Sequence, residues 1–361
     1  MAYFFTPAMN AGDTLIIQHY GYCFFNPTGW FPKPDRLPIR IASVCFSDSG
    51  GYQLYSLNKD HQNGNGSIRC IVIPGVGIKT RKNCLIIDPI DLCRKYGELD
   101  IDYGFTLDHP LSDNASQDEY EINLQKSYEW AKLMIDLRDD LCPRTKLLIP
   151  LHFYTEQQLR HYFNTMSGLN PDGYALPVRN TSTWKDMVRI AYTLCFLQHK
   201  KVKTVHMFGS SRREIIILGA AATGLGMFQQ LSFDSTSWNT AIYGIKYLNP
   251  KTLKLHSVHD IRKLQLNLPD SLIQEIQSTL IDPALQNKLI LLHNVFSISD
   301  YANAMLKRAK ETEVLKRFIE NTPHLRVERR RLLTSIDILH TSMELGFPYI
   351  EKWYSWIWNI V

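Results

Sequence analysis

Short apolar runs alternate along the chain with longer segments whose apolar residues recur at helical intervals. The runs are long enough for buried strands and short for helices, and they cover residues 39–46, 102–107, 146–151, 173–176, 204–208 and 227–233. The helical pattern covers residues 119–141, 155–166, 183–197 and 211–224, with Thr155 as an expected N-cap. The alternation predicts repeated β/α units with parallel strands.

These repeated units favour an α/β fold, a (β/α)8 TIM barrel with insertions, over a doubly wound open sheet. No G-x-G-x-x-G motif follows the first predicted strand, which argues against a dinucleotide-binding sheet. From residue 241 onward the alternation fades, and segments 271–322 and 326–346 have helical patterns. We expect a catalytic barrel over residues 1–300 and a helical C-terminal extension over residues 301–361. The aromatic segment 347–361 is expected to pack back on the barrel, with a dimer contact as the alternative.

Four polar residues and one glycine stand where the predicted strands end, namely Asp48, Asp108, His152, Asp234 and Gly209. Catalytic residues of TIM barrels gather at the C-terminal ends of the strands. We therefore expect the three aspartates to converge on one barrel mouth. After Asp48, Gly51 leaves room for a flat ligand and Tyr52 can offer it a ring face. Ordinary turns capped by aspartate are the alternative interpretation.

Composition and charge leave several partners possible. The chain has 361 residues, 45% of them hydrophobic, and a net charge of +5, which permits a polyanionic partner without requiring one. The first residues do not have the pattern of a signal peptide, and no apolar run reaches the roughly 18 residues of a membrane span. The seven cysteines are scattered and form no C-x-x-C motif. We expect a cytoplasmic protein with free thiols and no membrane partner.

Several motifs, in order along the chain, resemble the tRNA-guanine transglycosylase superfamily. They are SDSGGYQLYS (47–56), the block 84–110, DGYALPV (172–178), the block 205–235 and LLHNVF (291–296). The first motif and the block 205–235, which is closest to the archaeal form, are the most specific. The resemblance implies a (β/α)8 barrel and a pentosyltransferase that exchanges guanine in a nucleic acid for a 7-deazaguanine base.

The resemblance also implies roles for particular residues. Asp234 is expected to be the nucleophile that forms a covalent glycosyl-enzyme, and Asp48 the acid/base for protons on the base nitrogens. Asp108 is expected to accept N–H groups from the base. The flipped base would lie between Tyr52 and Phe208. The other expected pocket residues are Gly51, Gly209, His152 and Leu176.

The sequence departs from the family pattern at the zinc site and in the base pocket. The family holds zinc with three cysteines and a histidine; His293 remains, but segment 262–272 has no cysteine. His256 and His259 are too few to replace those ligands. We therefore expect no zinc and no other cofactor. A glutamine of the family is replaced by Leu151 or His152, and Pro177 has no N–H for a base carbonyl.

The type of nucleic acid is inferred from what the sequence lacks. Some members of the superfamily insert 7-deazaguanines into bacterial or phage DNA, and this chain lacks the family's tRNA-associated features. We expect DNA as the substrate and a preQ0-type 7-deazaguanine as the incoming base. The expected setting is a bacterial cell or a phage-infected host. The protein partners considered are a second copy of the chain and other modification proteins. Arg212 and Arg213 are the expected phosphate ligands. The alternatives are tRNA as substrate, a non-catalytic nucleic-acid binder, and an O-glycoside hydrolase.

Overall fold

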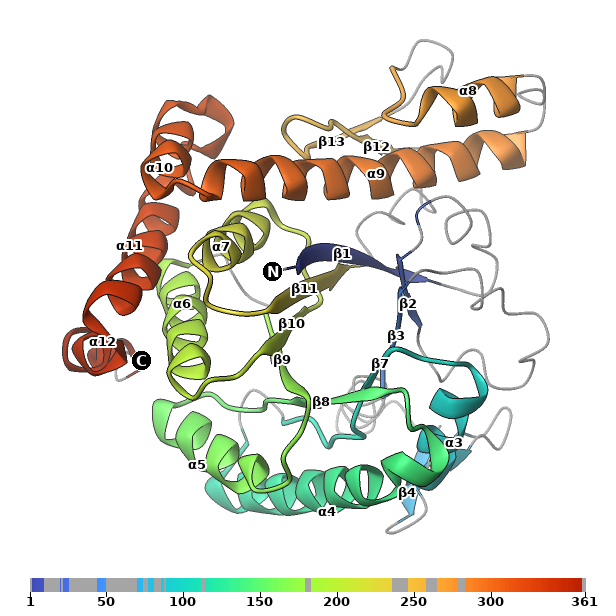
Figure 1. Cartoon of the computed structure of the whole chain (residues 1–361), viewed down its shortest axis with the longest axis vertical. Coiled ribbons are helices and arrows are strands. Elements are labelled where there is room, and N and C mark those ends of the chain that lie inside the picture. Colours follow the sequence, from blue (N-terminus) through green and yellow to red (C-terminus); the bar gives the residue numbers. More distant parts are fainter. Residues whose placement is uncertain are drawn as a thin grey trace. The chain divides into compact units, whose positions relative to one another are not determined.

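The computed structural model describes residues 2–9, 20, 22–25, 44–49, 70–73, 77–80, 86–87, 89–111, 115–178, 183–235, 246–257, 265–277 and 283–358. Strands β1, β2, β3, β7, β8, β9, β10 and β11 form a closed barrel in the order β1-β11-β10-β9-β8-β7-β3-β2 (Figure 1). Their bounds are Ala2–Met9, Tyr22–Phe25, Val44–Ser47, Tyr103–Phe105, Lys146–Pro150, Gly173–Pro177, Thr204–Phe208 and Gln230–Ser235. The predicted (β/α)8 barrel is confirmed.

Four helices follow the later barrel strands, as the sequence pattern predicted: α4 (Gln117–Leu141), α5 (Glu156–Ser167), α6 (Trp184–His199) and α7 (Arg213–Gly224). A further helix, α3 (Pro89–Glu98), precedes β7 and was not predicted. The Thr155 hydroxyl accepts a hydrogen bond from the Gln158 N–H, so Thr155 is the N-cap of α5 as expected. The predictions for α4 to α7 agree with the structure to within two residues at each end.

Two small sheets lie outside the barrel. Strands β4 (Cys70–Ile73), β5 (Gly77–Thr80) and β6 (Ile86–Ile87) form one antiparallel sheet, and β12 (Lys246–Leu248) and β13 (Leu255–Ser257) form the other. The sequence pattern predicted no element over β12 and β13. Each has three residues, which is too short for a period of two to stand out from a helical pattern.

The chain divides into two compact units. One, here called the C-terminal unit, consists of Met1–Pro7, Gln18–Tyr20 and Val178–Val361, and the other, the N-terminal unit, of Ala8–Ile17 and Gly21–Pro177. The C-terminal unit holds α8 (Asp270–Gln277), α9 (Pro283–Ala309), α10 (Thr312–Asn321), η6 (Pro323–Leu325), α11 (Arg329–Leu345), α12 (Phe347–Tyr354) and η7 (Ser355–Trp358). The boundary predicted at residue 300 lies inside α9.

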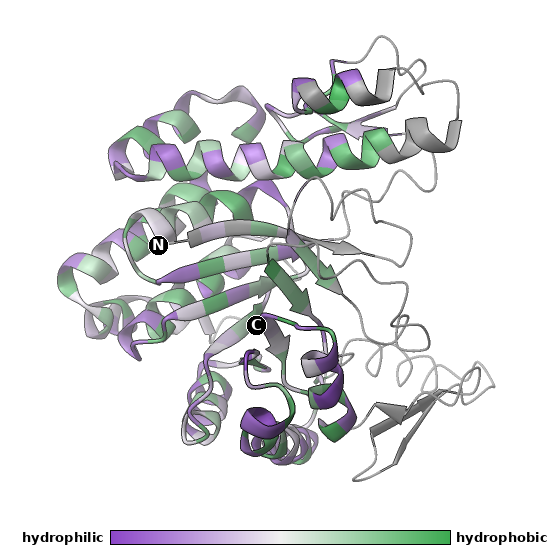
Figure 2. Cartoon of the chain, turned by 45° about the vertical axis from the view of Figure 1, so that its right-hand side comes forward, coloured by the Kyte–Doolittle hydropathy of each residue, from purple (hydrophilic) through white to green (hydrophobic). Residues whose placement is uncertain are grey.

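The C-terminal helices pack on the barrel helices of their own unit. Helix α9 carries hydrophobic and hydrophilic residues side by side, as a helix with one buried face does (Figure 2). Tyr192 and Phe196 of α6 contact Phe347 of α12 at ring-centroid distances of 5.3 and 5.8 Å. The Trp184 ring of α6 stacks on Trp356 at 5.8 Å. The prediction that the aromatic C-terminal segment packs back on the barrel is confirmed.

One glycine in the N-terminal unit lets a barrel strand approach a helix closely. A Cβ on Gly104 of β7 would lie 2.3 Å from the ring of Tyr96, a fully buried residue of α3. With no side chain at residue 104, the Tyr96 hydroxyl reaches the Phe105 carbonyl and donates to it at 2.8 Å. Burial raises the pKa of this hydroxyl well above its usual value, so it stays a donor at all physiological pH values.

None of the helices in the described part of the chain has the length and apolar character of a membrane span. The cysteines with described side chains, Cys23, Cys45, Cys93, Cys142 and Cys195, are all buried, and none of them forms a disulfide bond. For these five residues, the prediction of reduced thiols is confirmed.

Candidate active site

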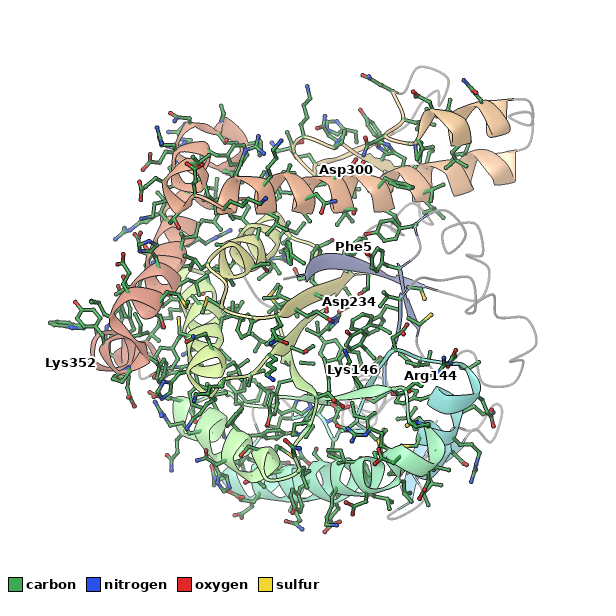
Figure 3. The ribbon with its side chains drawn as sticks, in the orientation of Figure 1. Phe5, Arg144, Lys146, Asp234, Asp300 and Lys352 are labelled. Carbon is green, nitrogen blue, oxygen red and sulfur yellow. The ribbon has the colours of Figure 1, made fainter. Side chains whose placement is uncertain are left out.

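Asp234 lies near the C-terminal end of β11 and belongs to a short polar row inside the C-terminal unit (Figure 3). Ser232 and Asp234 are two residues apart on one strand, so their side chains lie on the same face. His206 of β10 is paired in register with Ser232. Its Nδ1 lies 2.8 Å from the Ser232 hydroxyl, and its Nε2 lies 3.1 Å from Oδ1 of Asp234. The histidine bridges the serine and the carboxylate.

A backbone N–H also binds the Asp234 carboxylate. The Gly209 N–H donates to Oδ1 of Asp234 at 2.8 Å. Gly209 has φ of +80°, a conformation that glycine adopts without strain, and it turns the chain directly after β10. Both hydrogen bonds therefore end on Oδ1. Among the residues that the structure describes, no hydrogen-bond partner contacts Oδ2 of Asp234.

This arrangement suits a carboxylate that attacks a carbon atom. The Asp234 side chain is 9% exposed, so the hydrogen bonds act in a site with little competing water. Because an ionised carboxylate only accepts hydrogen bonds, the two donors on Oδ1 fix its orientation. The second oxygen keeps its lone pairs for an electrophile. Phe208, at the end of β10, is half-buried and packs edge-on to the His206 ring at 5.0 Å.

The two predicted phosphate ligands differ in their surroundings. Arg212 is exposed, and its N–H donates to the Ser210 hydroxyl at 3.3 Å. Arg213 donates to Oε1 of Glu328 at 2.9 Å and to the His324 carbonyl at 3.0 Å, and its side chain is 16% exposed. These contacts give Arg213 a role in holding the start of α11 to α7. They do not support the phosphate role predicted for it.

A second carboxylate cluster lies in the N-terminal unit. Asp108, three residues after the end of β7, is buried, and its Oδ2 lies 2.6 Å from Nε2 of His152. The Ser49 hydroxyl donates to Oδ1 of Asp108, also at 2.6 Å. The His152 ring packs edge-on to the buried Tyr162 at 6.0 Å. The structure thus brings two predicted residues, Asp108 and His152, into direct contact.

Asp48 lies at the end of β3 and beside Ser49. It is half-buried, and its Oδ1 accepts a hydrogen bond from the Ser49 N–H at 2.8 Å. The Tyr96 hydroxyl lies 3.2 Å from the Asp48 carbonyl and 2.8 Å from the Phe105 carbonyl, so Tyr96 ties the ends of β3 and β7 together. This tyrosine places the backbone that carries Asp48 and Asp108.

The remaining predicted pocket residues have mixed outcomes. Leu176 of β9 is 2% exposed and Leu151 is fully buried, so of the two candidates for the replaced glutamine only His152 offers a polar group. Pro177 ends β9. Gly51, Tyr52 and His259 lie outside the described residues.

His293 matches the zinc-binding histidine of the family pattern, but in this structure both of its ring nitrogens bind protein atoms. It is fully buried in α9; its Nδ1 accepts from the Asn267 N–H at 2.7 Å, and its Nε2 donates to the Leu248 carbonyl at 2.9 Å. Burial lowers the pKa of this ring, which favours the neutral form. Both ring nitrogens therefore hold protein segments together and are not directed at a metal.

Sequence reasoning missed the residues that support the two carboxylates. Ser49 contacts Asp108, Tyr96 the Asp48 carbonyl, and His206 Asp234. Ser232 contacts the His206 ring. A signal for Ser232 was present, because a polar residue two positions before Asp234 shares its strand face. His206 gave no such signal, since the register between two strands is not visible in the sequence.

No protein-family model matches this chain, and no curated protein matches it significantly. Its function is therefore inferred from the geometry of these clusters and from the motif resemblance.

Proposed function

We propose that the chain is a base-exchange enzyme that replaces guanine in DNA with a 7-deazaguanine base through a covalent glycosyl-enzyme. The observation that carries this proposal is the Asp234 carboxylate, with both hydrogen bonds on Oδ1 at the C-terminal end of a barrel strand. A carboxylate held in this way can attack a sugar carbon with its other oxygen. The motif resemblance supplies the substrate class.

The proposed reaction has two steps that retrace one another. Oδ2 of Asp234 attacks C1′ of the nucleotide as the bond from C1′ to the guanine N9 breaks, with positive charge developing on the sugar. Asp48 delivers the proton that the departing base takes up. The incoming base then loses its N9 proton to Asp48 and attacks C1′, and the bond to Asp234 breaks. The backbone of the nucleic acid stays intact. The atoms and charges of the two steps balance without an oxidant, a reductant or a metal.

Recognition of the base is assigned to Asp108, as the motif resemblance implies. Ser49 and His152 orient its carboxyl group, whose oxygens can accept N–H groups of a purine edge. Carboxylates read donors on nucleobases in this way. Phe208 would stack against the flipped base. Arg212 remains the proposed phosphate ligand because its side chain is exposed.

A parallel assay with two substrates tests this function. The purified full chain is incubated with radiolabelled guanine and either a DNA duplex or an unmodified tRNA, and label in the polymer is counted. The proposal predicts incorporation into DNA. Label in tRNA alone would keep the enzyme and correct the substrate. If neither polymer takes up label although both bind, the chain is a nucleic-acid binder and the proposal fails.

A further inference from the structure

We infer that Ser232 and His206 are positioning residues: Ser232 orients the His206 ring, and the ring binds Oδ1 of Asp234 so that Oδ2 is turned toward the substrate. This inference rests on the proposed function for its chemical consequence. Its structural part, the coupling of Ser232, His206 and Asp234, stands on the hydrogen bonds alone.

The burial of His206 determines where its protons are. The side chain is fully buried, so its ring nitrogens bond to protein atoms, which are the Ser232 hydroxyl and Oδ1 of Asp234. An ionised carboxylate cannot donate, so Nε2 must carry a hydrogen. A hydroxyl can donate or accept, so the Ser232 hydroxyl holds Nδ1 and orients the ring. Ser232 therefore places Nε2 where it donates to Asp234.

Hydrogen bonds on one oxygen suit a carboxylate that must lose its charge. When Oδ2 bonds to C1′, the negative carboxylate becomes a neutral ester, and Oδ1 becomes the ester carbonyl. The hydrogen bonds from His206 and Gly209 to Oδ1 persist in both states. The serine thus has a positioning role besides filling the strand interface.

Three variants separate this role from simple packing. His206→Phe keeps a ring and removes the donor; His206→Gln places an amide N–H near the position of Nε2; Ser232→Ala removes the group that orients the ring. Single-turnover exchange in His206→Phe should slow by about 10- to 100-fold, as expected for a lost hydrogen bond to a charged group, with KM for the polymer nearly unchanged. His206→Gln should recover most of the lost rate, and Ser232→Ala should slow about 5-fold.

A second readout does not depend on activity. Nitrogen NMR of the wild-type protein should show a hydrogen on Nε2 of His206, and Ser232→Ala should shift the Nδ1 signal because it removes the bond to that nitrogen. Hydrogen exchange at the Gly209 amide should quicken about 10-fold in His206→Phe and return toward wild type in His206→Gln, because the carboxylate that binds this amide is then released or held again.

The two readouts separate the possible failures. The expected ring-nitrogen and amide shifts in a protein without any base exchange would overturn the proposed function and leave the coupling intact. An active protein in which His206→Phe changes neither the exchange rate nor the Gly209 amide would overturn this inference. Equal losses in His206→Phe and His206→Gln would also overturn it, because they would show that packing matters and the donor does not.

Discussion

The two units each contain an aspartate bonded to a histidine and assisted by a serine, but they arrange these groups differently. In the C-terminal unit Ser232 contacts the histidine, and the hydrogen bonds to Asp234 end on one oxygen. In the N-terminal unit Ser49 contacts the carboxylate itself, and both oxygens of Asp108 are occupied. The first arrangement leaves an oxygen for bond formation. The second fixes a carboxylate as a rigid acceptor.

The comparison shows that a shared pair of residue types does not define a role. A nucleophile needs an accessible lone pair on an oriented oxygen. A recognition group needs both oxygens oriented, so that it rejects ligands with the wrong donor pattern. The two clusters differ in what the serine hydroxyl contacts. It contacts the histidine ring next to Asp234, the proposed nucleophile, and the carboxylate itself in Asp108, the proposed recognition group.

Replacement of Asp234 should have the largest effect. In Asp234→Asn the amide oxygen can still accept the bonds from Gly209 and His206, but the second position becomes an NH2 group that cannot attack carbon. We expect base exchange to fall by about 10⁴-fold or more, as when a covalent nucleophile is removed. Single-turnover assays measure the loss. An unchanged unfolding midpoint is the control for an intact fold, and a variant that still exchanges base at a tenth of the wild-type rate would contradict the assignment.

The next largest effect should come from the ion pairs that hold α11 to α7 in the C-terminal unit. Glu214 and Arg331 lie 2.6 Å apart with side chains 7% and 14% exposed. Arg331→Met leaves a buried carboxylate unpaired and should lower the free energy of unfolding by about 2–4 kcal/mol.

A surface pair in the N-terminal unit provides the control. Arg94 and Asp91 on α3 are about half exposed, so Arg94→Met should change the free energy of unfolding by less than about 0.5 kcal/mol. Urea denaturation compares the two variants. Equal effects would show that burial does not distinguish these pairs.

Replacement of Asp108 should affect base recognition more than bond formation. Asp108→Asn places an NH2 group against Ser49 or His152, where an acceptor is needed. We expect KM for the incoming base to rise by about 10- to 100-fold, with a smaller change in kcat. Steady-state exchange at several base concentrations measures both constants. A fall in kcat with unchanged KM would instead give Asp108 a role in the chemical step.

A histidine beside Asp108 should cause a smaller, pH-dependent effect. Burial, and secondarily the charge of Lys126, lowers the pKa of His109 to about 4. Below the unfolded value of about 6.5 the unfolded chain binds a proton that the folded chain does not, so stability is lost as pH falls from 6.5 toward 4. His109→Gln should remove about 1–3 kcal/mol of this loss between pH 7 and pH 4.5.

Urea denaturation of both proteins at the two pH values tests this effect. A difference in unfolding free energy between the wild type and His109→Gln that is the same at pH 7 and pH 4.5 would contradict it.

The sequence predicted most of the barrel because its signals are local. Thr155, the helical spacing of α4 to α7 and the apolar runs of β8 to β11 each depend on neighbours along the chain. Strand β1 was not predicted, because its eight residues include Pro7, and proline is unusual inside a sheet.

The structure brings together two predicted site residues that follow adjacent strands, whereas contacts that cross between strands were not predicted. Asp108 and His152 follow adjacent strands and meet as barrel topology requires. The bond from His206 to Asp234 depends on the register of β10 against β11. Arg213 pairs with Glu328, a residue 115 positions away, and no local pattern reveals such a partner.

Peptide mapping of a quenched reaction tests the nucleophile most directly. The full chain is mixed with a guanine-containing DNA oligonucleotide, denatured within the first turnover, digested and examined by mass spectrometry. The account predicts a base-free nucleotide attached to the peptide that carries Asp234, and none in Asp234→Asn. An adduct on another residue, or efficient base exchange without any adduct, would contradict it.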